Sequence, residues 1–133
     1  MARVRAKNTG PELALRRALW AAGIRGWRCH VSSVPGTPDL CWQSRKIAVF
    51  VDSAWWHGHP SRWVAGRHPP EWDQKIERNM KRDAEVNAIL KASGWAVVRI
   101  WDFDLVDDIE VAVGQVRRAI SGIDIDGAHQ ADP

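Results

Sequence analysis

The sequence predicts one α/β domain in which helices cover a small, mixed central β-sheet. Its 133 residues, 45% hydrophobic and 26% charged, have the size and balance of a single soluble domain that buries its own core. An uninterrupted apolar run from Ile47 to Val51 is typical of a strand buried on both faces. The rest of the chain contains both helical and strand-like segments. These observations exclude a disordered chain, a collagen and a coiled coil.

The first element is a helix predicted over residues 11–22. Its apolar side chains recur near helical spacing at Leu13, Leu15, Leu19 and Trp20. Pro11 suits the first turn of this helix, and Gly23 suits its C-terminal cap.

Three strand-like segments follow the first helix. One runs from Arg25 to Val31, and the next opens at Asp39, directly after the turn residues 33–38, and continues to Trp42. The run from Ile47 to Val51 follows a basic turn at residues 44–46 and is expected to form the middle of the sheet.

The second half of the chain begins with an irregular segment, Asp52 to Pro70, that is rich in Trp, His and Pro. Loops of this length are usually functional or mobile. A long charged helix is expected next, from Glu71 to Ser93, with Gly94 as its stop. Its apolar residues near helical spacing are Ile76, Met80, Ala84, Ile89 and Leu90.

A further strand, Trp95 to Trp101, and a closing amphipathic helix, Leu105 to Ile120, complete the domain. This last helix should direct Val113, Val116 and Ile120 inward. We therefore expect a single domain over residues 1–120 and a flexible tail over residues 121–133.

Charge and cysteine usage say little about function but exclude several classes of protein. The net charge of +3 permits a polyanionic partner without requiring one. Cys29 and Cys41 form no motif of paired cysteines, which argues against a disulfide framework and a cysteine-rich zinc site. No stretch is apolar enough for a signal peptide or a membrane span, so a cytoplasmic protein without membrane contact is expected. Because a core of this size has limited room for nine Trp side chains, some should face a ligand or partner.

Two acidic residues at predicted strand ends are the first candidates for chemistry. Asp39 heads one strand and Asp52 ends the neighbouring one, so the two carboxylates and nearby backbone carbonyls could form an oxygen cage for Mg²⁺. The alternative is that Asp39 caps a turn and Asp52 merely ends a strand.

A histidine pair in the long loop is the second candidate. His57 or His59 could act as a general base near neutral pH, the two could share a transition metal, or they could simply pack or face solvent.

The third candidate is the long helix, where Trp72 precedes several Lys and Arg residues. This pattern suits either a DNA surface or a solvated charged face.

Taken together, these segments resemble the very short patch repair endonucleases, bacterial mismatch-nicking enzymes related in fold to type II restriction endonucleases. The resemblance spans residues 1 to about 105 and is carried by PGTPD (35–39), VFVDSAWWHGHP (49–60) and KIERNMKRD (75–83), in this order and spacing. It implies a restriction-endonuclease-like α/β fold with a small mixed sheet flanked by helices.

The resemblance also implies the parts of a metal-dependent nuclease. Asp39 matches the main metal-binding carboxylate, which bridges two Mg²⁺ ions with help from the backbone carbonyl of Val51. His57 matches the general base that activates water, in the place where restriction enzymes commonly use a lysine. Asp83 would orient or charge that base. Two secondary acidic groups complete the catalytic set, Asp52 and Glu12.

The substrate implied is double-stranded DNA with a T:G mismatch, which arises when 5-methylcytosine deaminates and which the family nicks 5′ of the T. Trp55, Trp56 and Trp72 match the aromatic residues that wedge into DNA beside the mismatch. Lys75 and Asn79 match residues that contact the mispaired bases. Met1, which opens a basic stretch to Lys7, also belongs to the DNA-binding set. Nicking one strand needs one active site, so a monomer is expected. It would act at the bacterial nucleoid, with repair proteins as further partners.

This chain departs from the family pattern at a structural zinc site. The positions that hold zinc in much of the family read Ala54, His59, Ser61 and Phe103, so no structural zinc is expected and a hydrophobic plug should replace it. Members also commonly carry an upstream arm that touches DNA. Either that arm is lost here, or the true start lies before Met1.

Two other functions remain compatible with these residues. A related restriction-type or site-specific endonuclease would cut DNA without mismatch selectivity. A catalytically silent DNA-binding module would keep the aromatic wedge without the metal cage, although the intact set of Asp39, His57 and Asp83 argues against it.

Overall fold

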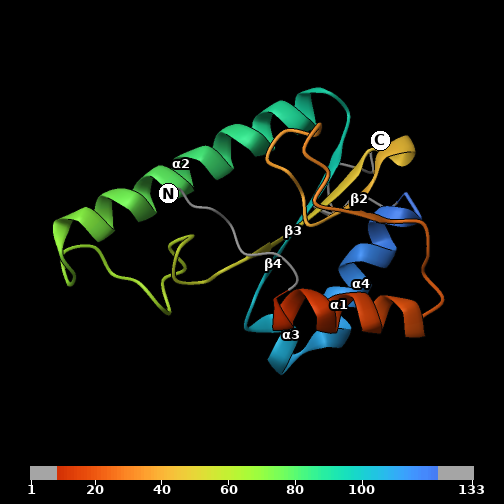
Figure 1. Ribbon diagram of the computed structural model, residues 1–133, viewed down its shortest axis with the longest axis horizontal. Helices are drawn as coiled ribbons and strands as arrows, with labels where there is room; N and C mark the ends of the chain where they lie inside the picture. Colours follow the sequence, from red (N-terminus) through yellow and green to blue (C-terminus); the bar gives the residue numbers. More distant parts are fainter. Residues whose placement is uncertain (1–8, 123–133) are drawn as a thin grey trace.

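The computed structural model describes residues 9–122 of the chain (Figure 1). Met1, the basic stretch after it and residues 123–133 of the expected tail lie outside the described residues. The elements in chain order are α1 (Gly10–Ala21), β1 (Arg28–Cys29), β2 (Leu40–Trp42), the 3-10 turn η1 (Gln43–Arg45), β3 (Ile47–Asp52), α2 (Pro70–Ala92), β4 (Ala96–Trp101), α3 (Asp104–Asp107) and α4 (Ile109–Ile120).

The four strands form one mixed sheet in the order β1-β2-β3-β4. β1 pairs with β2 and β2 pairs with β3 in antiparallel fashion, whereas β3 and β4 run parallel. A parallel pair needs a crossover connection, and the long loop together with α2 supplies it. The predicted α/β class with a small mixed sheet is confirmed, and β3 is buried along its whole length, as the apolar run from Ile47 predicts.

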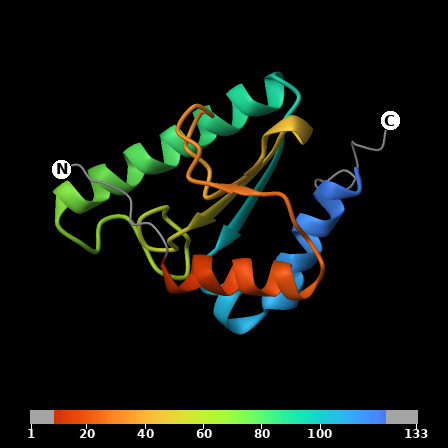
Figure 2. The same cartoon turned by 45° about the vertical axis from the view of Figure 1, so that its right-hand side comes forward.

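The two faces of the sheet are covered by different helices (Figures 1 and 2). Alternate residues of β3 separate the faces, because successive side chains on a strand point to opposite sides. Val49 and Val51 pack with Leu15 and Leu19 of α1 and with α3 and α4. On the other face, a second apolar cluster is formed by Val34, Cys41, Ala48, Phe50, Val86 and Leu90, the last two from α2.

Several expectations about individual elements were wrong. The first strand is only Arg28–Cys29, because Gly26 (φ 95°) and His30 (φ 52°) both leave the extended conformation. The closing helix is broken at Asp108, whose φ of −154° is not helical, so that α3 and α4 are separate.

The apolar faces of two helices also differ from the expectation. Trp20, Met80 and Ile89 stand 59%, 40% and 52% exposed, although their spacing suggested core positions. The buried stripe of α2 is Ile76, Val86 and Leu90. Of the three residues expected to point inward from α4, Val113 and Val116 are buried and Ile120 is partly buried against the same core. Among residues 9–122, no helix has both the length and the apolar character needed to cross a membrane.

Candidate active site

A cavity of about 890 Å³ lies where β3 ends, between the start of α1, the long loop and α2. It is lined by many of the residues that the sequence singled out. These are Glu12, Val51, Asp52, Trp56, His57, Lys75, Asn79 and Asp83. Asp39, Trp55 and Trp72 lie outside this lining set. The fold thus brings together side chains from four separate segments of the sequence.

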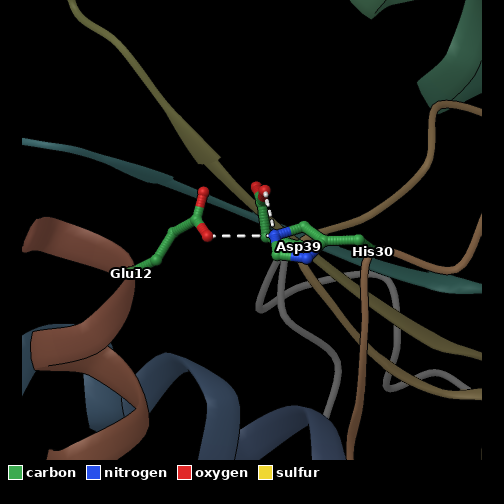
Figure 3. A group of neighbouring side chains, drawn as sticks. All are labelled: Glu12, His30 and Asp39. Atoms are coloured by element: carbon green, nitrogen blue, oxygen red, sulfur yellow. Dashed lines mark hydrogen bonds and ion pairs between the residues drawn. The ribbon is translucent and has the colours of Figure 1, made fainter. Parts of the chain in front are cut away.

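Glu12, His30 and Asp39 form one compact group, the Asp39 cluster (Figure 3). The His30 Nε2 atom lies 3.0 Å from Glu12 Oε1 and 3.9 Å from Asp39 Oδ1. Both acids are buried, Glu12 at 4% and Asp39 at 0% exposure. The cluster places two carboxylates and an imidazole within 4.8 Å of one another, a donor set that can hold a metal ion.

Local structure explains why these acids can stay buried. Thr9 caps α1 by accepting a hydrogen bond from the Glu12 backbone N–H at 3.4 Å, which fixes Glu12 in the first turn. The Asp39 carboxylate accepts a 2.7 Å hydrogen bond from the backbone N–H of Val51, and so ties the start of β2 to the end of β3. His30 donates its own backbone N–H to the carbonyl of Asp39 at 3.3 Å.

Asp52, His57 and Asp83 form a second group, the His57 cluster, and Arg99 lies in contact with it. His57 Nδ1 is hydrogen-bonded to the Asp83 carboxylate on α2 and lies 3.9 Å from Asp52 Oδ1 at the end of β3. The loop that carries His57 is held by a tight turn, in which its backbone N–H donates to the Ser53 carbonyl at 3.0 Å. A histidine is thus oriented by one carboxylate and approached by another.

Arg99 connects the carboxylates of this second cluster. Its Nη1 donates to both oxygens of Asp52 at 3.1 Å and lies 3.5 Å from Asp83 Oδ1. Its Nε donates to the side-chain oxygen of Asn87 on α2 at 2.8 Å, and its guanidinium carbon lies 4.2 Å from the centre of the Phe50 ring. This side chain therefore fills the space between the sheet and α2.

Burial and charge shift two titrations in the His57 cluster. Desolvation raises the pKa of Asp52, against the opposing influence of Arg99 and His57. Burial by itself lowers the pKa of His57, but the hydrogen bond to Asp83 and the charge of Asp52 outweigh it, and the net pKa of His57 is raised. His57 consequently holds a proton at higher pH than an ordinary histidine.

An aromatic surface lies beside the cavity. The rings of Trp55, Trp56 and Trp72 pack against one another at centroid distances of 5.9–6.3 Å. Trp56 is 36% and Trp72 45% exposed, whereas Trp55 is half-buried. Lys75 Nζ lies 4.7 Å from the Trp56 ring centre, and Asn79 donates a 3.0 Å hydrogen bond to the Trp56 carbonyl. The five residues predicted to bind DNA in this part of the chain therefore form one continuous face.

Comparison with known proteins identifies the family. The family described as DNA mismatch endonuclease Vsr matches residues 1–62. The type II nicking enzyme V.NmeDIP of Neisseria meningitidis is 41% identical over 121 residues, which cover 87% of this chain and 80% of the relative. V.HpaIIP of Haemophilus parainfluenzae, also a type II nicking enzyme, is 38% identical over 86% of this chain and 82% of its own length. The chain belongs to the Vsr family of DNA endonucleases.

The DNA mismatch endonuclease Vsr of Escherichia coli is a more distant relative, 27% identical over 77% of this chain and 66% of its own length. Membership of the Vsr family confirms the resemblance found in the sequence, the restriction-endonuclease-like α/β fold and the assignment as a DNA nicking endonuclease. Nucleases of this kind are typically metal-dependent, and both clusters contain side chains that could bind a metal ion.

Of the four residues at which a hydrophobic plug was expected in place of zinc, Ala54, His59 and Phe103 pack among rings and apolar atoms, whereas Ser61 is exposed. Ala54 is buried, and the His59 ring contacts Trp101 and Phe103 edge-on at centroid distances of 4.7 and 5.0 Å. These contacts are what a hydrophobic plug requires. The absence of a structural zinc ion stays a prediction.

Two residues of the site were missed in the sequence. No periodicity or motif marks His30, which reaches Glu12 and Asp39 only because its backbone adopts a left-handed conformation (φ 52°). Arg99 does carry a signal, since it is a charged residue inside the apolar run from Trp95 to Trp101. A buried strand tolerates such a charge only beside an acid.

Proposed function

We propose that this Vsr-family endonuclease nicks one strand of double-stranded DNA 5′ of the mispaired T in a T:G mismatch, in a Mg²⁺-dependent reaction that initiates very short patch repair. The observation that carries the proposal is one cavity lined by Glu12 and Val51, by His57 with Asp83, and by Trp56 with Lys75 and Asn79. Metal-binding, proton-accepting and base-contacting groups are thereby adjacent.

The Asp39 cluster is the part of the site that fits Mg²⁺. Its donors include buried carboxylate oxygens, and hard oxygen ligands are what Mg²⁺ prefers. We infer that the Asp39 carboxylate and the Val51 backbone carbonyl hold the metal, as a pair of ions, with Glu12 as a secondary acidic group. When bound, Mg²⁺ supplies Lewis-acid stabilisation of the negative charge on the reacting phosphate.

His57 supplies the proton acceptor in this proposal. Because Nδ1 is engaged by Asp83, the ring nitrogen left to accept a proton from water is Nε2. Asp83 fixes the ring orientation and stabilises the imidazolium that forms, and Asp52 adds a second negative charge at 3.9 Å. In this proposal the Asp39 cluster acts on the phosphate through the metal, and the His57 cluster accepts the proton of the attacking water.

The aromatic surface gives mismatch preference a physical basis. Trp56 and Trp72 are the exposed rings that can enter DNA, and Trp55 supports them from behind. Unstacking a base step costs a few kcal/mol and costs least where pairing is already defective. We assign Lys75 and Asn79 to the mispaired bases and Met1 to the DNA backbone, in a monomer that acts on the bacterial nucleoid, where repair proteins could follow it.

A site-specific nicking enzyme without mismatch selectivity is the second candidate. One observation favours it: the relatives reported at 38% and 41% identity are type II nicking enzymes, whereas the mismatch endonuclease of Escherichia coli is 27% identical.

A strand-resolved nicking assay separates the two functions. End-labelled duplexes carry each single mismatch, or the matched T:A and C:G pairs, in randomised flanking sequence, with Mg²⁺ or with EDTA. We expect a Mg²⁺-dependent nick 5′ of T in T:G duplexes alone. Equal nicking of matched duplexes would establish the second candidate, and nicking in EDTA would exclude the metal-dependent reaction.

A further inference from the structure

Arg99 is a charged side chain in the cavity to which no role in the reaction has yet been given. It lies in the middle of β4 between Val98 and Ile100, each 1% exposed, and opposite Phe50 of β3 in the parallel register. Its side chain points to the same face of the sheet as Phe50 and Asp52 and reaches Asn87 on α2. The guanidinium is therefore held on several sides and has little freedom to move.

The contacts of Arg99 converge on the two acids that flank His57. Nη1 bonds both oxygens of Asp52 at 3.1 Å and lies 3.5 Å from Asp83, while His57 Nδ1 is bonded to Asp83 and lies 3.9 Å from Asp52. We propose that Arg99 is the positioning residue of this active site, which fixes both carboxylates around His57 and supplies the permanent cation that their charges require. This inference rests on the proposed role of His57 as general base.

Charge balance shows what Arg99 changes. Asp52, Asp83 and His57 alone form an acid–histidine–acid set that could hold a metal ion, as the Asp39 cluster could. With the guanidinium in contact with both acids, one of their two negative charges is already compensated by a cation that is never deprotonated. Arg99 thus supplies the positive charge that a metal ion would otherwise bring to this cluster. The His57 ring remains able to exchange protons.

The charge of Arg99 also acts on His57 itself. It opposes the rise in the pKa of His57 that Asp83 and Asp52 cause, and so keeps this pKa closer to neutrality, where a general base works best. The charged groups around this ring are Asp52 from β3, Asp83 from α2 and Arg99 from β4. Further charged residues line the same cavity: Glu12, Lys75, Arg82 and Asp102.

Two variants separate the charge of Arg99 from its geometry. Arg99→Gln removes the charge, and Arg99→Lys keeps the charge but not the planar fork. Single-turnover nicking of T:G duplex is measured at saturating DNA across pH, together with the DNA dissociation constant. The NMR titration of the His57 ring is followed in the free proteins. Lys46→Met is the matched control, because it also removes one positive charge. Lys46 directly precedes β3, donates a 3.0 Å hydrogen bond to the Ser93 carbonyl and lies outside the cavity lining.

We expect Arg99→Gln to slow nicking by about 10- to 100-fold, as loss of an orienting partner does, with DNA affinity changed less than about twofold. Its His57 pKa and the acid limb of its rate profile should move to higher pH. Arg99→Lys should lower the rate but keep the acid limb near that of the wild type, and Lys46→Met should change neither quantity.

The inference is overturned if Arg99→Gln nicks at the wild-type rate with an unmoved acid limb. It is equally overturned if the whole loss of rate follows from unfolding, so that it disappears on cooling. If Arg99→Gln does not fold, Arg99→Lys decides, since an unchanged rate there contradicts the positioning role. If the wild type does not nick T:G duplexes, the mismatch proposal fails separately. The NMR titration, which needs no substrate, then still shows whether Arg99 controls His57.

Discussion

The Asp39 cluster and the His57 cluster contain the same residue types, two acids and one histidine, but lie in different surroundings. The Asp39 side chain is fully buried, whereas His57 and Asp83 retain 23% and 22% of their side-chain exposure. Arg99 lies in contact with both acids of the His57 cluster, while the arginine beside the Asp39 cluster, Arg16, lies 3.9 Å from Glu12. The same residue types therefore suit different chemistry in different surroundings. The Asp39 cluster suits a divalent cation, and the His57 cluster suits proton transfer.

Neutralising Asp39 should have the largest effect on nicking and tests whether the Asp39 cluster binds the metal. We expect Asp39→Asn to reduce nicking by about ten-thousandfold, because loss of metal stabilisation worth several kcal/mol changes the rate by a factor of ten per 1.36 kcal/mol. DNA binding should persist, since the role proposed for this carboxylate is to hold metal and not substrate. Nicking and gel-shift assays measure the two effects, with exposed Asp107→Asn as control. Loss of DNA binding in Asp39→Asn would contradict the metal role.

Removing the base of the other cluster should have the next largest effect. His57→Ala is expected to lower the nicking rate by about a thousandfold, within the usual range for a general base, and to abolish the acid limb of the rate profile. His30→Ala, the counterpart in the Asp39 cluster, should keep that limb. The measurement is the single-turnover rate between acidic and alkaline pH. An acid limb that survives in His57→Ala would exclude His57 as the base.

The pH dependence of nicking in Asp83→Asn tests whether Asp83 controls the pKa of His57. Because Asp83 raises the pKa of His57, and only neutral His57 can accept a proton, the wild-type rate should rise with pH through a pKa above the ordinary value of about 6.5. Asp83→Asn should shift this rise to lower pH. An unmoved limb would show that Asp83 does not control His57.

The same pair also makes stability depend on pH. A histidine whose folded pKa is raised stabilises the fold fully below its unfolded pKa, and this contribution is lost as pH rises through the folded pKa. The difference in unfolding free energy between wild type and Asp83→Asn should therefore be larger below about pH 6 than above the folded pKa of His57. Urea denaturation at several pH values measures it. A difference that grows with pH would contradict the assignment.

The smallest expected effect concerns the loop that carries His57. Gly58 has a positive φ of 72°, and a Cβ there would meet Met80 and approach Ile76 to 3.3 Å. Gly66 has a similar φ of 88° but open space around it. Each Gly→Ala change should cost about 1 kcal/mol for backbone strain, and Gly58→Ala should cost more and slow nicking several-fold. Equal losses of stability and activity in the two variants would show that loop packing against α2 is unimportant.

The sequence predicted the sheet and helices well where local patterns decide them. The apolar run from Ile47 correctly marked the central strand, and the segment predicted as irregular is free of helix and strand between the end of β3 at Asp52 and the start of α2 at Pro70. The exposure of Trp20 and Met80 could not be predicted, because spacing does not reveal which side of a helix receives a neighbour. The break at Asp108 escaped because nothing in the local periodicity interrupts the predicted helix.

The site was predicted less completely than the fold. Motif order identified His57 and the four acids but treated them as one set, since a linear sequence does not show that Glu12 comes from one face of the sheet and Asp83 from the other. The partners of His30 become visible only when β1 pairs with β2, and those of Arg99 only when β3 and β4 align. Their contacts join segments far apart in the chain, and no local signal encodes such distances.

The mixed sheet also determines when this enzyme becomes competent during folding. The antiparallel pairing of β2 with β3 closes a short turn, whereas the parallel pairing of β3 with β4 closes a much longer loop, from Ser53 to Trp95. Contacts of long sequence separation form slowly because the chain loses more entropy when it closes a large loop. Arg99 lies on β4, and Asp83 lies on the helix within this long loop. Both residues therefore join His57 only when β3 and β4 pair. A nascent chain therefore cannot complete the His57 cluster before β4 has paired with β3.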